Sequence, residues 1–541
     1  MCQPSRSPLV VFHVDMNSVA LREAYLRKWL QKASAMGYNG VLWEIEDKIA
    51  WETCPECVSP DAFSKKTFRE ILAYARSLGL EPVPLLQTVG HAEYVLQHEK
   101  YFSFREDPSK YDCYATCKPG VRRFIKRWID EYLDLFGEVR YFHLGGDEAY
   151  EFATSPECQA EMRNGGKGKL YADYIADIAQ PLLKRGIRPC IWGDQILHYP
   201  EAVRDLPKGV VIWDWNYSDG DTVPASVTVW DRGKRLSRAE LTPEDIRHFP
   251  EIIDSGGNLR AFYTADALKR LGYDVVLCSS ARSSGDAVFA VRQSLHAENI
   301  VGAARKTVEW GLLGTCVTSW AVRIPSYESQ QMLLCLAPLT VRNATAPLAG
   351  LRRMCVKETF GTPDQAIMDA TEQIGMPFPF VDGRTTGIQW TGMKDSRPAP
   401  PGYIRQLIGK WKSENGGAEW TANSELIRAS SVRIEKGVQE LNVFLPSAKK
   451  GFDVLDDWQS AGFFMSQGSL IAGAIVAGDG ARDSLESDGS VLRRLHDLRR
   501  EYKRWLGKRM TPRSAETSAG LVYDALIDYF EHTQVDSGVA R

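Results

Sequence analysis

The chain has 541 residues, of which 44% are hydrophobic and 25% are charged, and its formal net charge is −3. This balance provides no basic surface for nucleic acid, and no stretch reaches the roughly 20 apolar residues that a membrane span needs. We therefore expect neither a nucleic acid nor a membrane as partner. The composition indicates a globular protein that can bury a large core, with room for a barrel-sized domain and a second module.

The N-terminus and the cysteines predict a cellular compartment. Met1–Pro8 lacks the basic and apolar segments of a secretory signal. The 11 cysteines are neither dense nor even in number, so they do not indicate a disulfide framework. We expect a reducing compartment, and we predict a cytoplasmic location.

From Leu9 to about residue 325, short apolar or β-branched runs alternate with longer segments of helical spacing. Polar and aromatic residues gather at the C-terminal end of one predicted strand after another. This placement favours an α/β fold of the (β/α)8 TIM-barrel type over an open doubly wound sheet. Ser226–Trp230 is either a further strand or part of a loop. The predicted strands are Leu9–Val14, Gly40–Ile45, Glu81–Gln87, Arg140–Leu144, Arg188–Trp192, Val210–Trp215, Asp274–Ser279 and Gly314–Trp320, and the helices between them include Leu21–Met36, Lys65–Leu78, Pro119–Phe136 and Tyr171–Arg185.

The pattern changes after residue 330 and becomes mainly helical. Met376–Gly417 is rich in Pro and Gly and predicts a linker, whereas Asn423–His532 predicts several helices. We divide the chain into a barrel over residues 9–350, a helical or linker region over 351–420 and a helical C-terminal region over 421–541. The last region shows no chemical motif, and a role in packing or oligomerisation is its simplest interpretation. The clearest helices in this half are Glu328–Leu339, Pro363–Ile374, Val491–Leu506 and Ala515–Phe530.

The most informative segment is the fourth predicted strand with its end, Arg140–Ala149. On an extended strand, His143, Gly145 and Asp147 would share one face, and the glycines would let a ligand approach closely. Asp147 and Glu148 are adjacent carboxylates, so one pKa should rise, as suits a general acid. An acidic strand-to-loop turn is the alternative, but the complete string at the end of the fourth strand favours catalysis.

The string His143–Glu148 resembles the His-x-Gly-Gly-Asp-Glu signature of family 20 glycoside hydrolases, in particular the hexosaminidase D-like branch. The likeness covers roughly residues 9–340. It implies an exo-acting β-N-acetylhexosaminidase that needs no cofactor or metal. Its substrate would be a glycan or small aminosugar compound with a terminal non-reducing N-acetylglucosamine or N-acetylgalactosamine. Further strings that carry the resemblance are Val41–Asp47, Pro84–Tyr94, Val211–Tyr217 and Thr318–Trp320.

In this family the acetamido group of the substrate is the nucleophile, and hydrolysis proceeds through an oxazolinium intermediate with retention of configuration. The resemblance implies that Glu148 is the general acid and that Asp147 accepts the acetamido N–H. His91 would contact the region of the acid, His143 would face the barrel mouth, and Asp194 is a weaker candidate for a sugar hydroxyl. The sugar pocket would be formed by Trp192, Trp213 and Trp320, with Tyr217 donating a hydrogen bond to the acetamido oxygen.

Two departures from the family leave the preferred sugar open. The first strand has no arginine that could bind sugar hydroxyls, whereas many members have one. After Trp320, this chain has Ala321 and Arg323 where many members have a glutamate. Two rival functions remain: a non-catalytic N-acetylhexosamine-binding barrel, and a retaining glycosidase whose own carboxylate, Glu46 or Asp286, is the nucleophile. The oligomeric state is open, with a homodimer among the alternatives.

Several cysteines lie on predicted loops of the same barrel face. Cys54 and Cys57 form a Cys-x2-Cys pair, and Cys113, Cys117 and Cys158 lie on neighbouring loops. Four thiolates would suffice for a structural zinc site, but Ser155 interrupts the second pair. We take free thiols as the default and leave zinc as the alternative.

Overall fold

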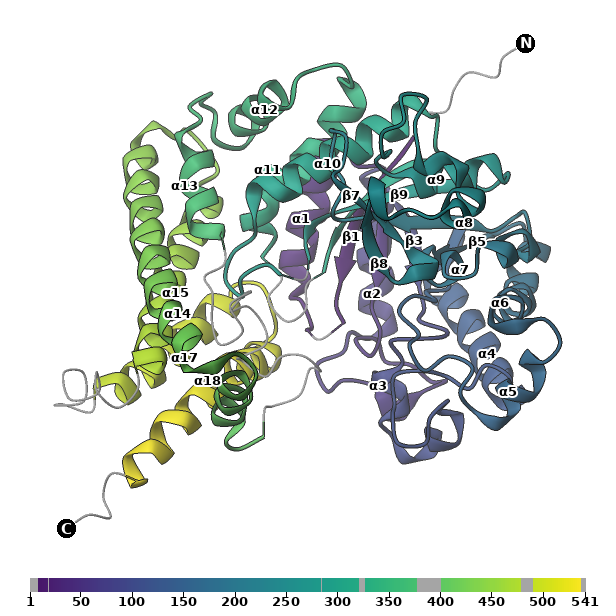
Figure 1. The fold of residues 1–541 in the computed structure, drawn as a ribbon, viewed down its shortest axis with the longest axis horizontal. Helices are drawn as coiled ribbons and strands as arrows, with labels where there is room; N and C mark the ends of the chain where they lie inside the picture. The colour runs from purple at the N-terminus through teal and green to yellow at the C-terminus, as the bar shows by residue number, and fades with distance from the viewer. Residues whose placement is uncertain are drawn as a thin grey trace.

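The computed structural model describes residues 8–17, 19–283, 285–320, 326–376, 400–477 and 490–536. Eight parallel strands close into a barrel in the order β1-β10-β9-β6-β5-β4-β3-β2 (Figure 1). All the predicted barrel strands are confirmed with ends that differ by a few residues, and the fold is the predicted TIM barrel. The strands are β1 (Leu9–Asp15), β2 (Gly40–Glu44), β3 (Glu81–Leu85), β4 (Tyr141–His143), β5 (Arg188–Trp192), β6 (Val211–Trp215), β9 (Asp274–Arg282) and β10 (Gly314–Ser319).

The inside of the barrel is filled by side chains and is not a pore. Every residue of β1 is buried, because helices cover one face of the strand and the barrel interior covers the other. With this packed interior beneath, a ligand at the C-terminal ends of the strands meets the loops that follow them. The inner cluster includes Val11, Leu42, Val83, Cys190, Trp192, Trp213, Cys278 and Cys316.

The outer helices bury one face each against the strands. In α2 (Lys65–Ser77), Phe68, Ile71, Leu72 and Ala75 are buried at helical spacing, and the N-cap Ser64 accepts a hydrogen bond from Thr67 N at 3.1 Å. The other long outer helices are α1 (Glu23–Met36), α4 (Pro119–Phe136), α6 (Gly166–Lys184), α9 (Tyr263–Arg270), α10 (Gln293–Glu309) and α11 (Tyr327–Arg342), and the short ones are α3 (Glu93–Leu96), α5 (Pro156–Met162), α7 (Asp194–Leu197) and α8 (Pro243–His248).

The ambiguous run at Ser226–Trp230 is a strand outside the barrel. β7 (Ser226–Val229) pairs antiparallel with β8 (Lys234–Ser237), and this hairpin is inserted between β6 and β9. Val227, Val229 and Leu236 are buried, so the hairpin packs onto the barrel end through one face.

The C-terminal helices stand together on one side of the barrel (Figure 1). The helix α14 begins at Tyr403, inside the stretch predicted to be a linker. The prolines of that stretch lie before Gly402, whereas Ile404 and Ile408 are spaced for one buried helix face. Residues 377–399 of the predicted linker lie outside the described part, and the domain boundary near residue 350 stays a prediction. These helices are α12 (Leu348–Phe360), α13 (Ala366–Gly375), α14 (Tyr403–Phe444), α15 (Phe452–Ala477), α17 (Ser490–Leu506) and α18 (Pro512–Asp536).

A buried ion pair anchors the C-terminal helices to the barrel. Arg509 is 2% exposed and donates from Nη2 to Asp457 Oδ1 at 2.6 Å. Asp457 also accepts from Trp505 Nε1 at 2.9 Å and from the hydroxyl of Ser326, the N-cap of α11. The C-terminal region is therefore tied to the helix that follows β10.

Arg509→Met is expected to destabilise the protein by about 3–5 kcal/mol, because it leaves the Asp457 carboxylate buried without its cation. Urea unfolding followed by circular dichroism measures the loss. The matched control is Lys508→Met, which breaks the exposed pair of Lys508 Nζ and Asp456 Oδ2 at 2.6 Å. This control should cost less than about 1 kcal/mol. Equal losses in the two variants would show that Arg509 is no anchor.

Candidate active site

The loop that carries the carboxylates is shaped by two glycines. β4 ends at His143, and Gly145 and Gly146 have φ values of 64° and 91°. A Cβ at Gly146 would lie 2.5 Å from the Tyr171 hydroxyl oxygen. The expectation of an extended strand with His143, Gly145 and Asp147 on one face is therefore wrong. The left-handed glycines turn the chain before the carboxylates.

Asp147 and Glu148 meet His91, which lies on the loop after β3. His91 Nε2 is 3.5 Å from Asp147 Oδ2 and 3.5 Å from Glu148 Oε2. Gly90 allows this approach, since a Cβ there would lie 2.6 Å from the backbone oxygen of Asp147. Asp147 is 6% exposed, whereas the side chain of Glu148 is 41% exposed. One imidazole thus bridges a buried and an open carboxylate.

The pKa shifts of this trio follow from its geometry. Burial raises the pKa of Asp147, and the neighbouring charge of Glu148 raises it further. The hydrogen bond from His91 lowers the pKa of Glu148. Burial lowers the pKa of His91, but Asp147 and Glu148 outweigh it and hold that pKa well above its usual value. One pKa of the adjacent pair is thus raised, as expected, but it belongs to Asp147 and not to Glu148, because His91 lies against Glu148.

Asp194, at the start of α7, fixes the position of Glu148. Its Oδ2 accepts from Glu148 N at 2.9 Å, and its Oδ1 accepts from Trp215 Nε1 at 3.1 Å. Glu148 has a φ of 43°, an uncommon value for this residue type, and the Asp194 bond holds it there. Burial and the charge of Asp147 raise the pKa of Asp194 to about 7. Both oxygens are engaged, which suits Asp194 to position Glu148, and its contact with a sugar hydroxyl stays a prediction.

The predicted aromatic residues come together over the barrel interior. The ring centroid of Trp192 is 6.0 Å from that of Trp213, at 90°, and 5.7 Å from that of Trp320. Tyr217 accepts a hydrogen bond from Trp320 Nε1 at 2.8 Å. Within the described residues, the indole nitrogens of Trp192 and Trp213 have no hydrogen-bond partner, and neither does Asp147 Oδ1.

His143 lies at the C-terminal end of β4 against two of the tryptophans, and its predicted place at the barrel mouth stays a prediction. It is fully buried, with its ring 4.4 Å from Trp192 and 5.2 Å from Trp213 between centroids. Its Nδ1 accepts from Gly145 N at 3.1 Å, and burial holds its pKa well below the usual value. A neutral His143 thus supports the tryptophan walls from below.

A model of the glycosyl hydrolase family 20 catalytic domain matches residues 30–229. Residues 30–229 of the barrel are therefore similar to the catalytic domain of this family. Hexosaminidase D of Bos taurus is 30% identical over 214 residues, which are 38% of this chain and 62% of the relative. Hexosaminidase D of Homo sapiens is 29% identical over 240 residues, 42% of this chain and 49% of the relative. The chain thus spans 62% and 49% of the length of these two relatives. A solved beta-N-acetylhexosaminidase from Bacteroides fragilis NCTC 9343 is similar at 18% identity, with a TM-score of 0.45, over 61% of this chain and 66% of that chain.

The barrel carries polar residues near the site that the sequence analysis did not identify. His13 Nε2 lies 3.1 Å from Glu44 Oε2, and Gln87 Nε2 donates to Glu44 Oε1 at 3.0 Å. The ring of His13 lies 4.9 Å from that of Trp320. The sequence feature that could have identified these residues is a polar side chain at or near the C-terminal ends of three neighbouring strands, β1, β2 and β3. Tyr150 was missed as well, and its hydroxyl donates to Glu148 Oε1 at 2.9 Å.

The two rival nucleophiles have unsuitable surroundings. Asp286 is bound by His296 Nε2 at 2.8 Å and by Arg292 Nε at 2.7 Å, as expected of a structural ion pair. Glu46 is 6% exposed, and burial followed by the charge of Glu44 raises its pKa well above the usual value. A neutral carboxyl group is a poor nucleophile. Both observations count against an enzymic nucleophile at these positions.

Four of the five cysteines on the barrel face lie in two pairs, and Cys113 is in neither. Cys57 Sγ is 2.9 Å from Cys54 O, and the side chains of Cys117 and Cys158 are hydrogen bonded to each other. In the part of the chain that the structure describes, no three His, Cys, Asp or Glu residues are grouped so that they could hold a metal ion. Nor does any described helix have the length and apolarity to cross a membrane.

Proposed function

We propose that the chain is an exo-acting β-N-acetylhexosaminidase, which removes terminal non-reducing N-acetylglucosamine or N-acetylgalactosamine from a glycan or aminosugar-containing compound with retention of configuration. The observation that carries the proposal is the pairing of buried Asp147 with accessible Glu148 through His91, beside the tryptophan cluster. The two hexosaminidase D relatives support the same activity.

Asp147 is suited to orient the acetamido group of the substrate. Its Oδ2 lies toward His91, whereas its buried Oδ1 has no partner among the described residues. An acetamido N–H that binds Oδ1 would place the carbonyl oxygen beneath the anomeric carbon and would be stabilised as positive charge develops on the oxazolinium ring. Since the nucleophile is part of the substrate, the attack is intramolecular and has an entropic advantage.

Glu148 is suited to protonate the leaving oxygen. Its carboxylate is the exposed member of the pair, and Tyr150 and the Asp194 bond to its backbone fix its direction. In the free site the proton resides on His91, 3.5 Å away. When substrate displaces water from Glu148, the charged carboxylate is disfavoured, and the proton moves to it from His91.

The aromatic cluster is suited to hold the sugar and its acetamido group. Trp192, Trp213 and Trp320 offer apolar walls for the methyl group and the pyranose ring. Burial raises the pKa of Tyr217 well above its usual value, so its hydroxyl stays protonated. That oxygen accepts from Trp320 and is also hydrogen bonded to the side chain of Thr318, so an acetamido oxygen would compete with Thr318 for the hydroxyl.

The test is release of p-nitrophenol from the β-N-acetylglucosaminide, the β-N-acetylgalactosaminide and the plain β-galactoside. Turnover of the N-acetylated substrates alone is expected, and the faster of the two defines the preferred epimer. Binding of N-acetylhexosamines without turnover would favour the non-catalytic barrel. Turnover of the plain galactoside at a comparable rate would favour an enzymic nucleophile.

The rate should depend on pH through His91. The trio of His91, Asp147 and Glu148 keeps its catalytic proton below the raised pKa of His91 and loses it above. We expect kcat/KM to fall as the pH rises through that value, which lies above 6.5. In His91→Asn the proton must reside on a carboxyl group, so the alkaline limb should move to lower pH by about one unit or more. A pH profile with an unchanged limb would show that His91 does not store the proton.

We also propose that the protein acts in the cytoplasm. The cysteines within the described residues are free and buried, and thiol pairs in contact such as Cys117 and Cys158 persist in a reducing compartment. Fractionation of cells that express the full chain, followed by immunoblotting, tests this location.

A further inference from the structure

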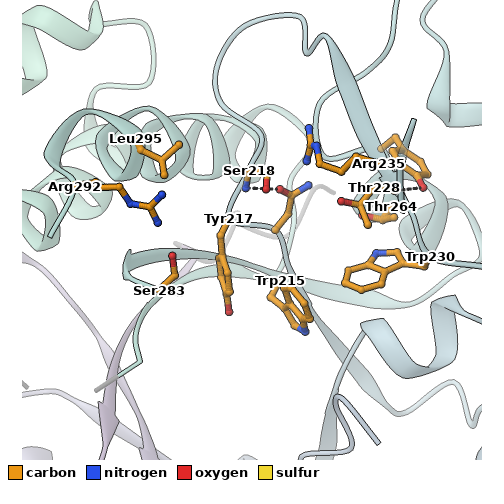
Figure 2. A pocket seen from close by; sticks show the side chains of 12 residues that line it. Trp215, Tyr217, Ser218, Thr228, Trp230, Arg235, Thr264, Ser283, Arg292 and Leu295 are labelled. Carbon is orange, nitrogen blue, oxygen red and sulfur yellow. Dashed lines mark hydrogen bonds between the residues drawn. The ribbon is translucent and has the colours of Figure 1, made fainter. Parts of the chain in front are cut away.

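A cavity of about 440 Å³, shown in Figure 2, shares Tyr217 with the candidate active site. Its lining comes from the end of β6, from the β7–β8 hairpin and from the start of α10. Its volume lies within the ~300–1,000 Å³ range of small-molecule sites. The residues that line it are Trp215, Asn216, Tyr217, Ser218, Thr228, Trp230, Arg235, Tyr263, Thr264, Ser283, Arg292 and Leu295.

Two residues join this cavity to the catalytic groups. Trp215 lines it and donates to Asp194, whose other oxygen holds the backbone of Glu148. Tyr217 also lines it and binds Trp320 of the sugar pocket. The cavity is thus linked to the proposed acid through Trp215 and Asp194, and to the sugar pocket through Tyr217 and Trp320.

The cavity offers aromatic surfaces of the kind that bind sugar rings. Trp215 and Tyr217 are stacked, with 5.3 Å between ring centroids, and Trp230 meets Trp215 edge-on at 4.9 Å. Trp230 comes from the end of the β7–β8 hairpin's first strand. The hairpin therefore builds one wall of the cavity.

The charged groups of the lining are all cationic. Arg235 and Arg292 line the cavity, and no Asp or Glu does. Their carboxylate partners, Asp219 and Asp286, lie behind them with side chains 0% and 1% exposed, whereas the arginines are 35% and 24% exposed. In Figure 2 the arginines lie on opposite sides of Trp215 and Tyr217. The lining therefore offers no carboxylate to accept a hydrogen bond from a sugar hydroxyl, but it offers two guanidinium groups that can bind an anion.

We propose that this cavity binds the leaving-group unit of the substrate and selects a sugar that carries an anionic substituent, either a carboxylate or a sulfate. The inference rests on the proposed function. Guanidinium groups form the strongest protein hydrogen bonds to such anions, and aromatic faces bind the ring. The anionic group would lie toward Arg235, whose Nε and Nη2 are bound to Ser226 and Asp219 while no described contact uses its Nη1.

The test compares three disaccharides with the same terminal β-N-acetylhexosamine, linked to a neutral hexose, to a hexuronic acid or to a 6-sulfated hexose. We expect kcat/KM for one of the anionic substrates to exceed that for the neutral one by about tenfold at low salt, and this ratio to fall as salt is added. The two anionic arms distinguish a carboxylate from a sulfate. Arg235→Gln should reduce the ratio to about one, and Arg235→Lys should keep part of it.

Lys234→Gln is the matched control, because it removes an exposed positive charge from the same strand, outside the cavity lining. It should leave the ratio unchanged. A ratio near one in the wild type, or parallel losses on neutral and anionic substrates in Arg235→Gln, overturns the anionic subsite while leaving the hexosaminidase activity intact. If the wild type hydrolyses no β-N-acetylhexosaminide, the proposed function fails and the subsite with it.

Discussion

Glu148→Gln is expected to lower kcat/KM on an N-acetylhexosaminide with a sugar leaving group by about 10²–10⁴-fold, the usual contribution of a general acid. The amide has nearly the same shape as the carboxyl and can keep the contact with the Tyr150 hydroxyl, so the loss reports the proton and not the packing. Single-substrate kinetics at several pH values measure it, and the pH dependence that arises from the acid should disappear.

The leaving group provides the control for Glu148. A glycoside of 2,4-dinitrophenol needs no protonation to depart, so kcat/KM of Glu148→Gln on that substrate should return to within about tenfold of the wild type. An equal loss on both leaving groups would contradict the role of Glu148 as acid. It would point instead to a general disturbance of the loop that Asp194 holds.

Asp147→Asn is expected to lower kcat by about 10²–10³-fold, which is typical when a buried group that stabilises transition-state charge is removed. The variant loses the negative charge that faces the developing oxazolinium ring. Unlike the loss in Glu148→Gln, this loss should be the same for sugar and for 2,4-dinitrophenol leaving groups, because Asp147 acts on the nucleophile and not on the departing oxygen. Steady-state kinetics on the two substrates measure the difference.

Inhibitor binding provides the control for Asp147. A thiazoline analogue of the intermediate should bind Asp147→Asn much more weakly than the wild type, whereas binding of the product sugar should change less. Asp173→Asn, which removes an exposed carboxylate from α6 that pairs with Lys169 at 2.8 Å, should change neither. Equal weakening of analogue and product in Asp147→Asn would mean that Asp147 only shapes the pocket.

The barrel strands could be predicted from the sequence because the same pattern repeats along the chain. Each short β-branched run is followed by a segment with apolar residues at helical spacing, and several of these segments end in glycine. The pair Asp147 and Glu148 could be found because it belongs to one contiguous string. The start of α14 at Tyr403 could not, since the prolines nearby suggested a linker and the buried partners of Ile404 lie on other helices.

The electrostatics of the site depend on contacts between residues far apart in sequence. Whether Asp147 or Glu148 has the raised pKa is decided by His91, which lies on another loop 3.5 Å from both. Asp194 could be noticed as a strand-end carboxylate, but its bond to Glu148 N requires the three-dimensional turn at Gly145 and Gly146. The arginine-lined cavity likewise depends on how the β7–β8 hairpin folds back.

The central claim, that the acetamido group of the substrate is the nucleophile, is tested most directly with aryl glycosides whose N-acyl group carries none, one, two or three fluorine atoms. Each fluorine withdraws electrons from the carbonyl oxygen, so an attack by that oxygen should slow at every step. We predict a steep and continuous fall of kcat/KM across the series. The value for the trifluorinated substrate should be about 10²-fold or more below that for the unfluorinated one. A rate that is independent of fluorination would contradict substrate assistance and would assign the nucleophile to the protein.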